Sequence, residues 1–308
     1  MGRKIGIIGA NGFVGRQVAR RAGEAGVRVT GVVRSAEAAR VVAGAGVTPL
    51  LVENLDQGSI AALASGLAGC EGVVYTAGVS ARAQAKDRTD PQGLVNVIAA
   101  CQQAGVRKII FFSGLGVTHY GMNVHCTNPY FLAKLAGEVA LFRSEIAGVV
   151  FRPSYIFGVG EESLGPLMRR ILSEPAIEIP GDGSYRLQPI SVEDTARAVL
   201  AALDSRGLGP AAFDLVGPEV VSYRDLVERA SAELGKVVTI RERPVEDAVR
   251  AARTSSYFGM RSHDLACLLC DEVSDAKPVG ALVGQSLETL DVMIRRVADT
   301  LRAEGAIK

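Results

Sequence analysis

Three glycines separate an apolar segment from a helical pattern near the start of the chain. Residues 4–21 read KIGIIGANGFVGRQVARR, with Gly9, Gly12 and Gly15 between the two patterns. In a parallel α/β sheet, glycines in the first strand-to-helix turn permit a tight turn, the approach of a pyrophosphate and close helix packing. The helix N-terminus then offers free N–H groups and a partial positive charge. The spacing therefore predicts a dinucleotide-binding turn.

The alternation of strand and helix continues through the first half of the chain. Amphipathic stretches such as 15–26 and 93–105 separate apolar runs rich in β-branched residues, and this pattern predicts a parallel sheet with helices on both faces. We therefore expect an α/β fold of the Rossmann type, doubly wound. The predicted strands are residues 4–9, 28–33, 48–53, 72–78, 108–114 and 148–154.

After residue 154 the regular alternation of strand and helix is replaced by shorter predicted elements. Residues 191–205 read as a helix capped by Ser191, and residues 211–217 as another strand. The second half therefore predicts a smaller substrate-binding lobe that is interleaved with the last strands of the sheet.

This reading divides the chain into two units with a ligand cleft between them. We assign residues 1–154 to the NAD(P)-binding core, completed by elements within about 186–216. Residues 155–185 and 217–308 are assigned to the smaller C-terminal lobe.

The bulk properties of the chain exclude several classes of partner. Its 308 residues carry a net charge of +1 and no long basic run, so nucleic acid is not an expected partner. No apolar stretch reaches the roughly 18 residues of a membrane span, and the first strand begins too early for a signal peptide. The five cysteines are scattered, and Cys267 and Cys270 lack a second ligand pair. We expect reduced thiols, no metal site and a cytoplasmic protein.

The end of the second strand bears on the choice of dinucleotide. NAD-selective proteins carry an acid there that binds the ribose 2′-hydroxyl. In this chain Val33 is followed by Arg34, with no carboxylate nearby on the strand. A guanidinium suits a 2′-phosphate because it donates paired hydrogen bonds. We therefore predict that NADP(H) is preferred over NAD(H).

Seven short segments follow one another in a recognisable order and spacing. They are GANGFVG (9–15), ENLDQGS (53–59), VVYTAG (73–78), NPYFLAKLAGEVAL (128–141), FRPSYIFG (151–158), GDGSYRLQPISVEDTARAV (181–199) and FDLVGPEVVSYRDLVE (213–228). Together they resemble the extended and atypical short-chain dehydrogenase/reductases over most of the chain. The last two segments are also similar to nucleotide-sugar epimerases and to the NADPH-binding accessory subunit of respiratory complex I.

The resemblance implies which residues hold the cofactor. They come from the glycine turn, the end of the second strand, the adenine segment, the fourth strand and the nicotinamide side. The implied residues are Gly9, Asn11, Gly12, Phe13, Val14, Gly15, Arg34, Asn54, Leu55, Thr76, Ala77, Gly78, Lys134 and Pro153.

The resemblance also implies a catalytic pair. Tyr130 and Lys134 are four residues apart, so they share one face of a helix. In the reducing direction the tyrosine would donate a proton while the cofactor delivers hydride. Lys134 would hydrogen-bond the nicotinamide ribose and favour the phenolate of Tyr130 by its charge.

One position departs from the family pattern. The family follows its fifth strand with a serine or threonine that hydrogen-bonds the substrate oxygen, and the matching residue here is Gly114. Ser113 lies one residue early, so it reaches the site only if the strand ends in a turn there. Thr118 and Thr127 are alternatives, and the remaining alternative is a site without this hydroxyl and with weakened catalysis.

Three functions remain open on this reading. The expected one is an NADP(H)-dependent oxidoreductase acting on a carbonyl or activated double bond of a small organic molecule. A nucleotide-sugar epimerase or dehydratase is the second, with Arg186 where such enzymes hold a diphosphate. The third is a non-catalytic NADPH-binding or sensor protein, which Gly114 favours and the Tyr130–Lys134 pair opposes.

The family also implies a possible homodimer. Substrate specificity would lie in the loops near residues 79–90, 115–128, 155–189 and 254–285.

Overall fold

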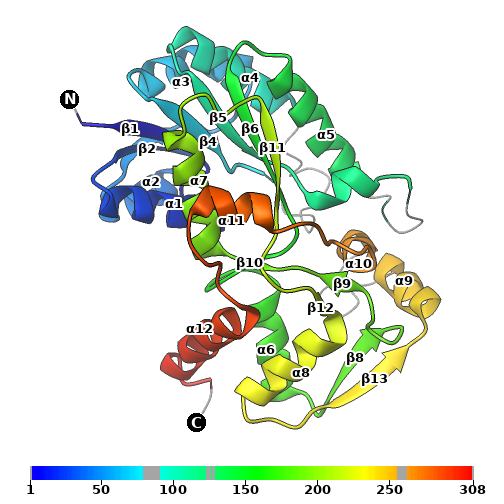
Figure 1. The fold of residues 1–308 in the computed structure, drawn as a ribbon. Helices are drawn as coiled ribbons and strands as arrows, with labels where there is room; N and C mark the ends of the chain where they lie inside the picture. The colour runs from blue at the N-terminus through cyan, green and yellow to red at the C-terminus, as the bar shows by residue number, and fades with distance from the viewer. Residues whose placement is uncertain (1, 79–90, 123–125, 127–128, 255–261, 307–308) are drawn as a thin grey trace.

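The computed structural model describes residues 2–78, 91–122, 126, 129–254 and 262–306 (Figure 1). Within these residues the largest sheet has seven strands in the order β11-β6-β5-β4-β1-β2-β3, and each neighbouring pair is parallel. The doubly wound α/β prediction is confirmed, and the six predicted strands are all in this sheet. Its strands are β1 (Lys4–Ile8), β2 (Arg28–Val33), β3 (Thr48–Leu51), β4 (Gly72–Tyr75), β5 (Lys108–Phe112), β6 (Ala147–Pro153) and β11 (Ala211–Leu215).

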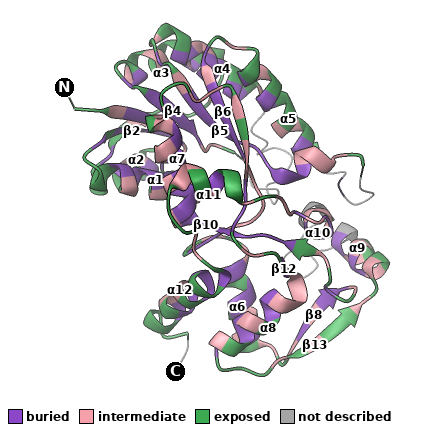
Figure 2. Cartoon of the chain, in the orientation of Figure 1, coloured by how far each residue is buried: buried purple, intermediate pink, exposed green. Residues whose placement is uncertain are grey.

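Helices cover both faces of this sheet, and the five central strands between them are mostly buried, whereas the edge strands β3 and β11 are largely half-buried or exposed (Figure 2). Each face has its own apolar core, because side chains on successive strand residues point to opposite sides. One face carries α1 (Phe13–Glu24), α2 (Ala36–Gly44), α7 (Val192–Asp204) and α11 (Lys277–Val283). The other carries α3 (Ile60–Leu67), α4 (Pro91–Gln103) and α5 (Pro129–Phe142).

A smaller lobe lies beyond the carboxyl ends of the strands (Figure 1). Its apolar core is formed mainly by α6 (Leu164–Ser173), α8 (Tyr223–Glu233) and α12 (Leu290–Ala303), packed with the parallel pair β8 (Ala176–Pro180) and β13 (Thr239–Arg243). The short pairs β7 (Ile156–Phe157) with β10 (Ile190–Ser191), and β9 (Arg186–Leu187) with β12 (Val221–Ser222), join the lobes. Two further helices, α9 (Val245–Thr254) and α10 (Ser262–Leu268), lie at the edge of the lobe.

The position of helix α11 differs from the predicted division of the chain. The prediction assigns residues 217–308 to the smaller lobe, but α11 packs against α7 and β11 of the dinucleotide-binding core. Val279 is buried in the core on the α1 side of the sheet. The chain therefore returns to the dinucleotide-binding core before it ends in α12.

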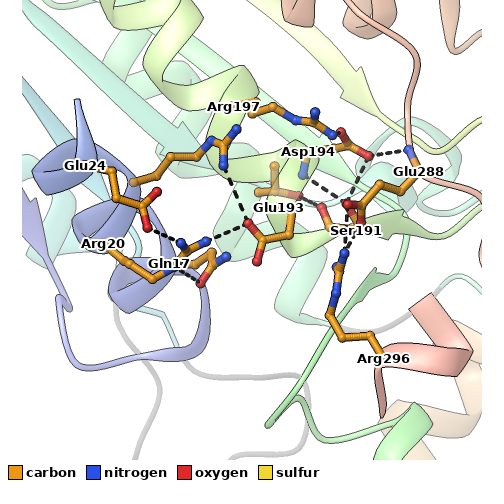
Figure 3. A network of polar contacts seen from close by, with 11 residues as sticks. Gln17, Arg20, Glu24, Ser191, Glu193, Asp194, Arg197, Glu288 and Arg296 are labelled. Atoms are coloured by element: carbon orange, nitrogen blue, oxygen red, sulfur yellow. Dashed lines mark hydrogen bonds and ion pairs between the residues drawn. The ribbon is translucent and has the colours of Figure 1, made fainter. Parts of the chain in front are cut away.

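A network of polar contacts connects the glycine-turn helix to the smaller lobe (Figure 3). Arg20 of α1 donates to Glu193 of α7 at 2.8 Å. The buried Asp194, next in α7, accepts the backbone N–H of Glu288 at 2.7 Å. Glu288 in turn accepts two hydrogen bonds of 2.9 Å from Arg296 of α12. The second half of α1, the start of α7 and the segment that leads into α12 are thereby connected, although they are far apart in the sequence.

The predicted helix start at Ser191 is present, since its side chain accepts the N–H of Asp194. All five cysteines are free thiols. Among the described residues no helix has the length and apolar character of a membrane span, and no group of His, Cys, Asp and Glu side chains is suited to hold a metal ion.

Candidate cofactor and active site

A cavity of roughly 690 Å³ lies where the carboxyl edge of the sheet faces the smaller lobe. One side is formed by the glycine turn and the ends of β4, β5 and β6, and the other by segments of the smaller lobe. Its size suits a small-molecule ligand. The predicted site residues that line it are Gly12, Phe13, Val14, Gly15, Thr76, Gly78, Ser113, Tyr130, Lys134 and Pro153.

The glycine turn is packed so closely that side chains would not fit. A Cβ on Gly15 would lie 2.2 Å from the carbonyl oxygen of Gly9 and 2.9 Å from Oγ1 of Thr76. Gly9 has a φ of +84°, and a Cβ there would lie 2.9 Å from the backbone nitrogen of Ala77. Thr76 Oγ1 completes the contact by donating to the carbonyl of Ile8 at 2.8 Å. The turn and the end of β4 are therefore in direct backbone contact, and Gly12 opens toward the cavity.

The predicted adenine side lies outside the cavity lining. Arg34 directly follows β2, is exposed, and has no ion pair or hydrogen bond within the described residues. Asn54 is exposed, and the carbonyl of Leu55 accepts a hydrogen bond of 2.8 Å from Asn96. Asn11 is exposed in the glycine turn. Asn11, Arg34 and Asn54 are thus solvent-exposed, and their contact with the adenosine part of a dinucleotide stays a prediction.

Tyr130 and Lys134 share one face of α5, as the spacing predicted. The Nζ of Lys134 donates to the carbonyl of Phe112 at 2.8 Å and lies 5.3 Å from the centre of the Tyr130 ring. A Cβ on Gly78 would lie 3.3 Å from the same Nζ. The lysine is thus fixed between the ends of β4 and β5, beside the tyrosine.

The helix that carries the pair is anchored by a buried ion pair. Glu138 lies one turn after Lys134 and is 2% exposed. Its two carboxylate oxygens accept hydrogen bonds of 2.9 and 2.5 Å from Arg152 of β6. A bidentate arginine–carboxylate pair fixes orientation as well as distance. This contact holds α5 against the sheet at the level of the catalytic candidates.

Ser113 reaches the cavity because β5 ends at Phe112. Its hydroxyl is buried and has no hydrogen-bond partner among the described residues, while its backbone N–H donates to Phe151 at 2.8 Å. A Cβ on Gly114 would instead lie 3.2 Å from the ring of Phe131. A buried hydroxyl without a partner is costly unless something else accepts it. Ser113 therefore brings an unpartnered hydroxyl to the cavity lining, whereas a side chain at position 114 would contact aromatic rings.

Burial changes the ionisation of the polar groups in the cavity. It raises the pKa of Tyr130 and lowers the pKa of Lys134 to about 8. The charge of Glu272, a buried acid nearby, raises the pKa of Tyr130 further. Burial also raises the pKa of Glu272 itself to about 8. Desolvation thus keeps Tyr130 neutral, which differs from the expected dominance of the Lys134 charge.

The weaker substrate predictions lie away from the lining. Arg186 is exposed, and its guanidinium donates to Asp271 at 3.0 and 2.8 Å. Thr118 donates to the carbonyl of Leu115 at 2.8 Å, within the 3-10 helix η3 (Leu115–His119). Thr127 and the loop 79–90 lie outside the described residues. A substrate role for these residues stays a prediction.

The wall of the cavity formed by the smaller lobe comes mainly from two segments that the sequence predicts only as regions, 155–189 and 254–285. Arg16 of α1 and the α8 side chains Tyr223 and Leu226 are outside every segment predicted to carry substrate specificity. Only their convergence in space identifies them, since no motif links the segments. The lining residues that the sequence analysis did not name as individual site residues are Arg16, Phe112, Tyr155, Ile156, Phe157, Gly160, Glu161, Glu162, Ser163, Leu164, Pro166, Leu167, Arg170, Leu187, Tyr223, Leu226 and Leu268, and Cys267 was named only for its CxxC spacing.

The fold, the glycine turn and the cavity beside it define a dinucleotide-binding protein of the Rossmann class. A family model described as NAD(P)H-binding matches residues 9–206. The chain belongs to this NAD(P)H-binding family, and its likeness to the extended short-chain dehydrogenase/reductases is confirmed.

Curated relatives agree with this assignment. A 2-alkyl-3-oxoalkanoate reductase of Stenotrophomonas maltophilia is 26% identical over 75% of this chain and 76% of its own length. The Arabidopsis thaliana mitochondrial NADH dehydrogenase [ubiquinone] 1 alpha subcomplex subunit 9 is 25% identical over 72% of this chain and 56% of its own length. The relatives thus include both a reductase and a respiratory-complex subunit.

Solved structures share the fold along nearly the whole chain. The NADPH-dependent quinone oxidoreductase of Escherichia coli, complexed with NADPH, has a TM-score of 0.75 at 21% identity, covering 96% of this chain and 99% of that one. A UDP-N-acetylglucosamine 4-epimerase from Bacillus cereus has a TM-score of 0.73 at 15% identity, covering 97% and 96%. At such identities the likeness establishes the fold alone.

Proposed function

We propose that this protein is an NADP(H)-dependent reductase of a carbonyl or activated double bond in a small organic molecule. The observation that carries the proposal is the meeting of Ser113, Tyr130 and Lys134 in the same cavity as the glycine turn. A nucleotide-binding protein without chemistry does not need a buried, unpartnered hydroxyl beside a tyrosine and a lysine. The relative that reduces 2-alkyl-3-oxoalkanoates supports the same reaction class.

The residues present fit a bound dinucleotide. The close backbone packing of Gly9 and Gly15 keeps the start of α1 open to a pyrophosphate, and Lys134 lies beside Gly78 on the nicotinamide side. When bound, NADPH supplies the hydride. In this proposal the side chains of the protein orient the substrate and supply the proton.

The geometry divides the remaining work among three side chains. Tyr130 donates a proton to the substrate oxygen, and its raised pKa keeps that proton available at neutral pH. Ser113 donates its free hydroxyl to the same oxygen and so orients the carbonyl. Lys134 is held by the Phe112 carbonyl, and its ammonium group favours the tyrosinate that forms on proton transfer.

The preference for NADP(H) over NAD(H) is part of the proposal. Arg34 supports it, because the guanidinium is exposed at the end of β2 and has no partner within the described residues. A 2′-phosphate at this edge would receive paired hydrogen bonds.

Oligomeric state and location remain predictions. Leu132, Leu135, Val139 and Phe142 are exposed along one side of α5, which is consistent with a homodimer formed through this sheet-flanking helix. Sedimentation of the wild type and of Leu135→Glu would test it, since a dimer should become a monomer in the variant. A cytoplasmic location also stays a prediction.

The alternative functions make different demands on the chain. A nucleotide-sugar epimerase needs a cation for the diphosphate, and the ion pair of Arg186 with Asp271 opposes that role. A non-catalytic NADPH sensor would leave Ser113 and Tyr130 without a task. Saturable binding of UDP-glucose that is lost in Arg186→Ala would support the first of these alternatives.

The test is oxidation of NADPH by purified protein against a panel of ketones, quinones and enones. We expect turnover of at least one compound, and a loss on the order of a hundredfold or more in kcat for Tyr130→Phe with NADPH affinity retained. Tight NADPH binding without turnover of any compound would favour the sensor reading. Full activity in Tyr130→Phe would remove the proton donor from the proposal.

A further inference from the structure

Aromatic side chains are concentrated around the cavity. The chain contains nine phenylalanines and seven tyrosines, and aromatic residues make up 5% of it. Six of these side chains line this one cavity, far more than the composition would place there: Phe13, Phe112, Tyr130, Tyr155, Phe157 and Tyr223. The last three belong to the smaller lobe, so the wall opposite the glycine turn contains three rings.

The rings of this wall are held by contacts with neighbouring rings. The centroids of the Tyr155 and Phe157 rings are 6.0 Å apart, and the rings are inclined by 52°. Tyr223 stacks on Tyr185 at 5.7 Å and 28°, and the Tyr185 hydroxyl donates to the carbonyl of Pro180 at 3.0 Å. Tyr185 is outside the cavity lining, so it supports the Tyr223 ring from outside the cavity. Such a wall favours a planar ring, because aromatic pairs gain from offset-stacked or edge-to-face contact.

Tyr155 adds a polar group to this aromatic wall. It lines the cavity, and its hydroxyl makes no hydrogen bond within the described residues. Burial raises the pKa of Tyr155, so the hydroxyl keeps its proton and can donate a hydrogen bond. A donor placed among apolar rings favours a ligand that carries an oxygen acceptor at the same point.

Tyr155 also lies close to the catalytic candidates, because β5 and β6 are neighbouring parallel strands. Phe112 of β5 pairs with Phe151 of β6. Ser113 directly follows β5, and its N–H donates to the carbonyl of Phe151 at 2.8 Å. Tyr155 follows the end of β6 by two residues. Neighbouring strands are about 4.8 Å apart, so groups at these two strand ends can contact one small molecule.

We infer that the substrate is an aryl ketone with a second oxygen on its ring, and that Tyr155 determines specificity by donating a hydrogen bond to that oxygen. The inference rests on the proposed reductase function and adds the substrate class. The reacting carbonyl lies at Ser113 and Tyr130, and the ring lies against Phe157 and Tyr223.

Two matched pairs of ketones test the ring and its oxygen separately. Acetophenone and cyclohexyl methyl ketone both carry a methyl ketone on a six-membered ring, but only the first ring is planar. Methoxyacetophenone and ethylacetophenone, substituted meta or para to the carbonyl, have nearly the same shape and differ by the ether oxygen. The readouts are kcat/KM with NADPH, and binding to the NADP+-loaded protein by saturation-transfer NMR. We expect acetophenone to bind about fivefold better than cyclohexyl methyl ketone, and the methoxy compound better than the ethyl compound in at least one ring position.

Tyr155→Phe tests the hydrogen bond, because it keeps the ring and removes only the hydroxyl. We expect the methoxy-to-ethyl ratio to fall by about fivefold in both readouts, and this comparison of ratios cancels the intrinsic reactivity of the ketones. Tyr75→Phe is the matched control. The Tyr75 hydroxyl also has no partner within the described residues, but it lies outside the cavity lining, so its loss should leave the ratio unchanged.

Tyr223→Leu tests the ring contact. It removes one ring from the wall, so the preference for acetophenone over cyclohexyl methyl ketone should fall by about threefold. Phe213→Leu is the control, because this ring packs on Phe151 of the sheet and is outside the cavity lining. Thermal unfolding of each variant checks that it is folded.

The outcomes separate this inference from the proposed function. If ketones are reduced but the methoxy-to-ethyl ratio is the same in the wild type and in Tyr155→Phe, the inference is overturned while the reductase function stands. Tighter binding of cyclohexyl methyl ketone than of acetophenone also overturns it, as does an unchanged acetophenone preference in Tyr223→Leu. If no ketone is reduced, the proposed function fails for this substrate class, and selective binding of methoxyacetophenone that is lost in Tyr155→Phe still supports the inference. Absence of aryl ketone binding overturns it.

Discussion

The two sides of the cavity are built in different ways. On the nucleotide side the shape comes from backbone atoms of one short segment, where Gly15 packs against the Gly9 carbonyl and the end of β4. On the substrate side it comes from side chains of β7, β9, α6, α8 and α10, which are far apart in the sequence. At Gly9 and Gly15 the nucleotide side has no room for an added Cβ. On the substrate side, the shape and polarity of the wall depend on which side chains are present. A fold of this kind can therefore keep one cofactor and change substrates by changing the second wall.

The largest expected effect tests whether the nucleotide side depends on bare backbone. Gly15→Ala would place a Cβ 2.2 Å from the Gly9 carbonyl oxygen, so the turn must open. We expect NADPH affinity to fall on the order of a thousandfold, measured by calorimetric titration. Gly23→Ala in the same helix is the control, because no atom lies within 4 Å of its added Cβ. Normal NADPH binding by Gly15→Ala would remove the distinction between the two sides.

The next largest effect concerns Ser113, which lines the cavity shared by the nucleotide side and the substrate side. Ser113→Ala removes the unpartnered hydroxyl, and we expect kcat to fall by about a hundredfold because one oriented donor is lost. Thermal stability should not fall, since no hydrogen bond within the described residues is broken. Ser205→Ala is the matched control, because that hydroxyl donates to the Ala201 carbonyl at 2.8 Å and lies outside the cavity lining. Equal turnover by Ser113→Ala and the wild type would contradict the role.

An effect of intermediate size, on the free energy of unfolding, tests the buried acid Glu272. The pKa of Glu272 is raised from 4.5 to about 8, so the unfolded chain loses this proton at lower pH than the folded protein. Between these values the stability of the wild type falls as pH rises. We expect Glu272→Gln to unfold with a free energy about 2 kcal/mol higher than the wild type near pH 8.5, with no difference near pH 4.

The control for this measurement is Glu53→Gln, an exposed position where we expect almost no change. Denaturant unfolding at several pH values gives the comparison. The prediction is contradicted if Glu272→Gln is less stable than the wild type at alkaline pH, or if the difference in unfolding free energy between them does not vary with pH. Either result would indicate that the Glu272 carboxylate is stabilised by a bonding partner in the folded protein.

The smallest effect sharpens the choice of dinucleotide. Arg34→Ala should weaken NADPH binding by about tenfold and leave NADH binding unchanged, because only NADPH carries the 2′-phosphate. Arg40→Ala is the control, since its side chain bonds the Ala36 carbonyl within α2. Tighter binding of NADH than of NADPH by the wild type would defeat the prediction.

The difference between the two sides also explains what could be predicted from the sequence. The strands and the glycine turn follow from local patterns, because period and backbone freedom are visible in neighbouring residues. The spacing of Tyr130 and Lys134 fixes a shared helix face in the same way. Whether Ser113 faced the cavity depended on where β5 ends, which the apolar run 108–114 did not specify.

Other features depended on contacts over long distances in the chain. The pairing of Arg186 with Asp271 spans 85 positions, and nothing near either residue indicates it. Tyr223 and Leu226 enter the cavity only because α8 packs beside α6. The return of α11 to the core likewise required the packing of Val279 beneath α7.

The most direct measurement of the central claim follows the transferred hydrogen. NADPH deuterated at the reactive C4 position would be incubated with the protein and a ketone that it turns over, and the alcohol product analysed by mass spectrometry. The account predicts one deuterium on the former carbonyl carbon, because both molecules occupy one cavity beside Tyr130. NADPH consumption with no deuterium in the product would contradict it.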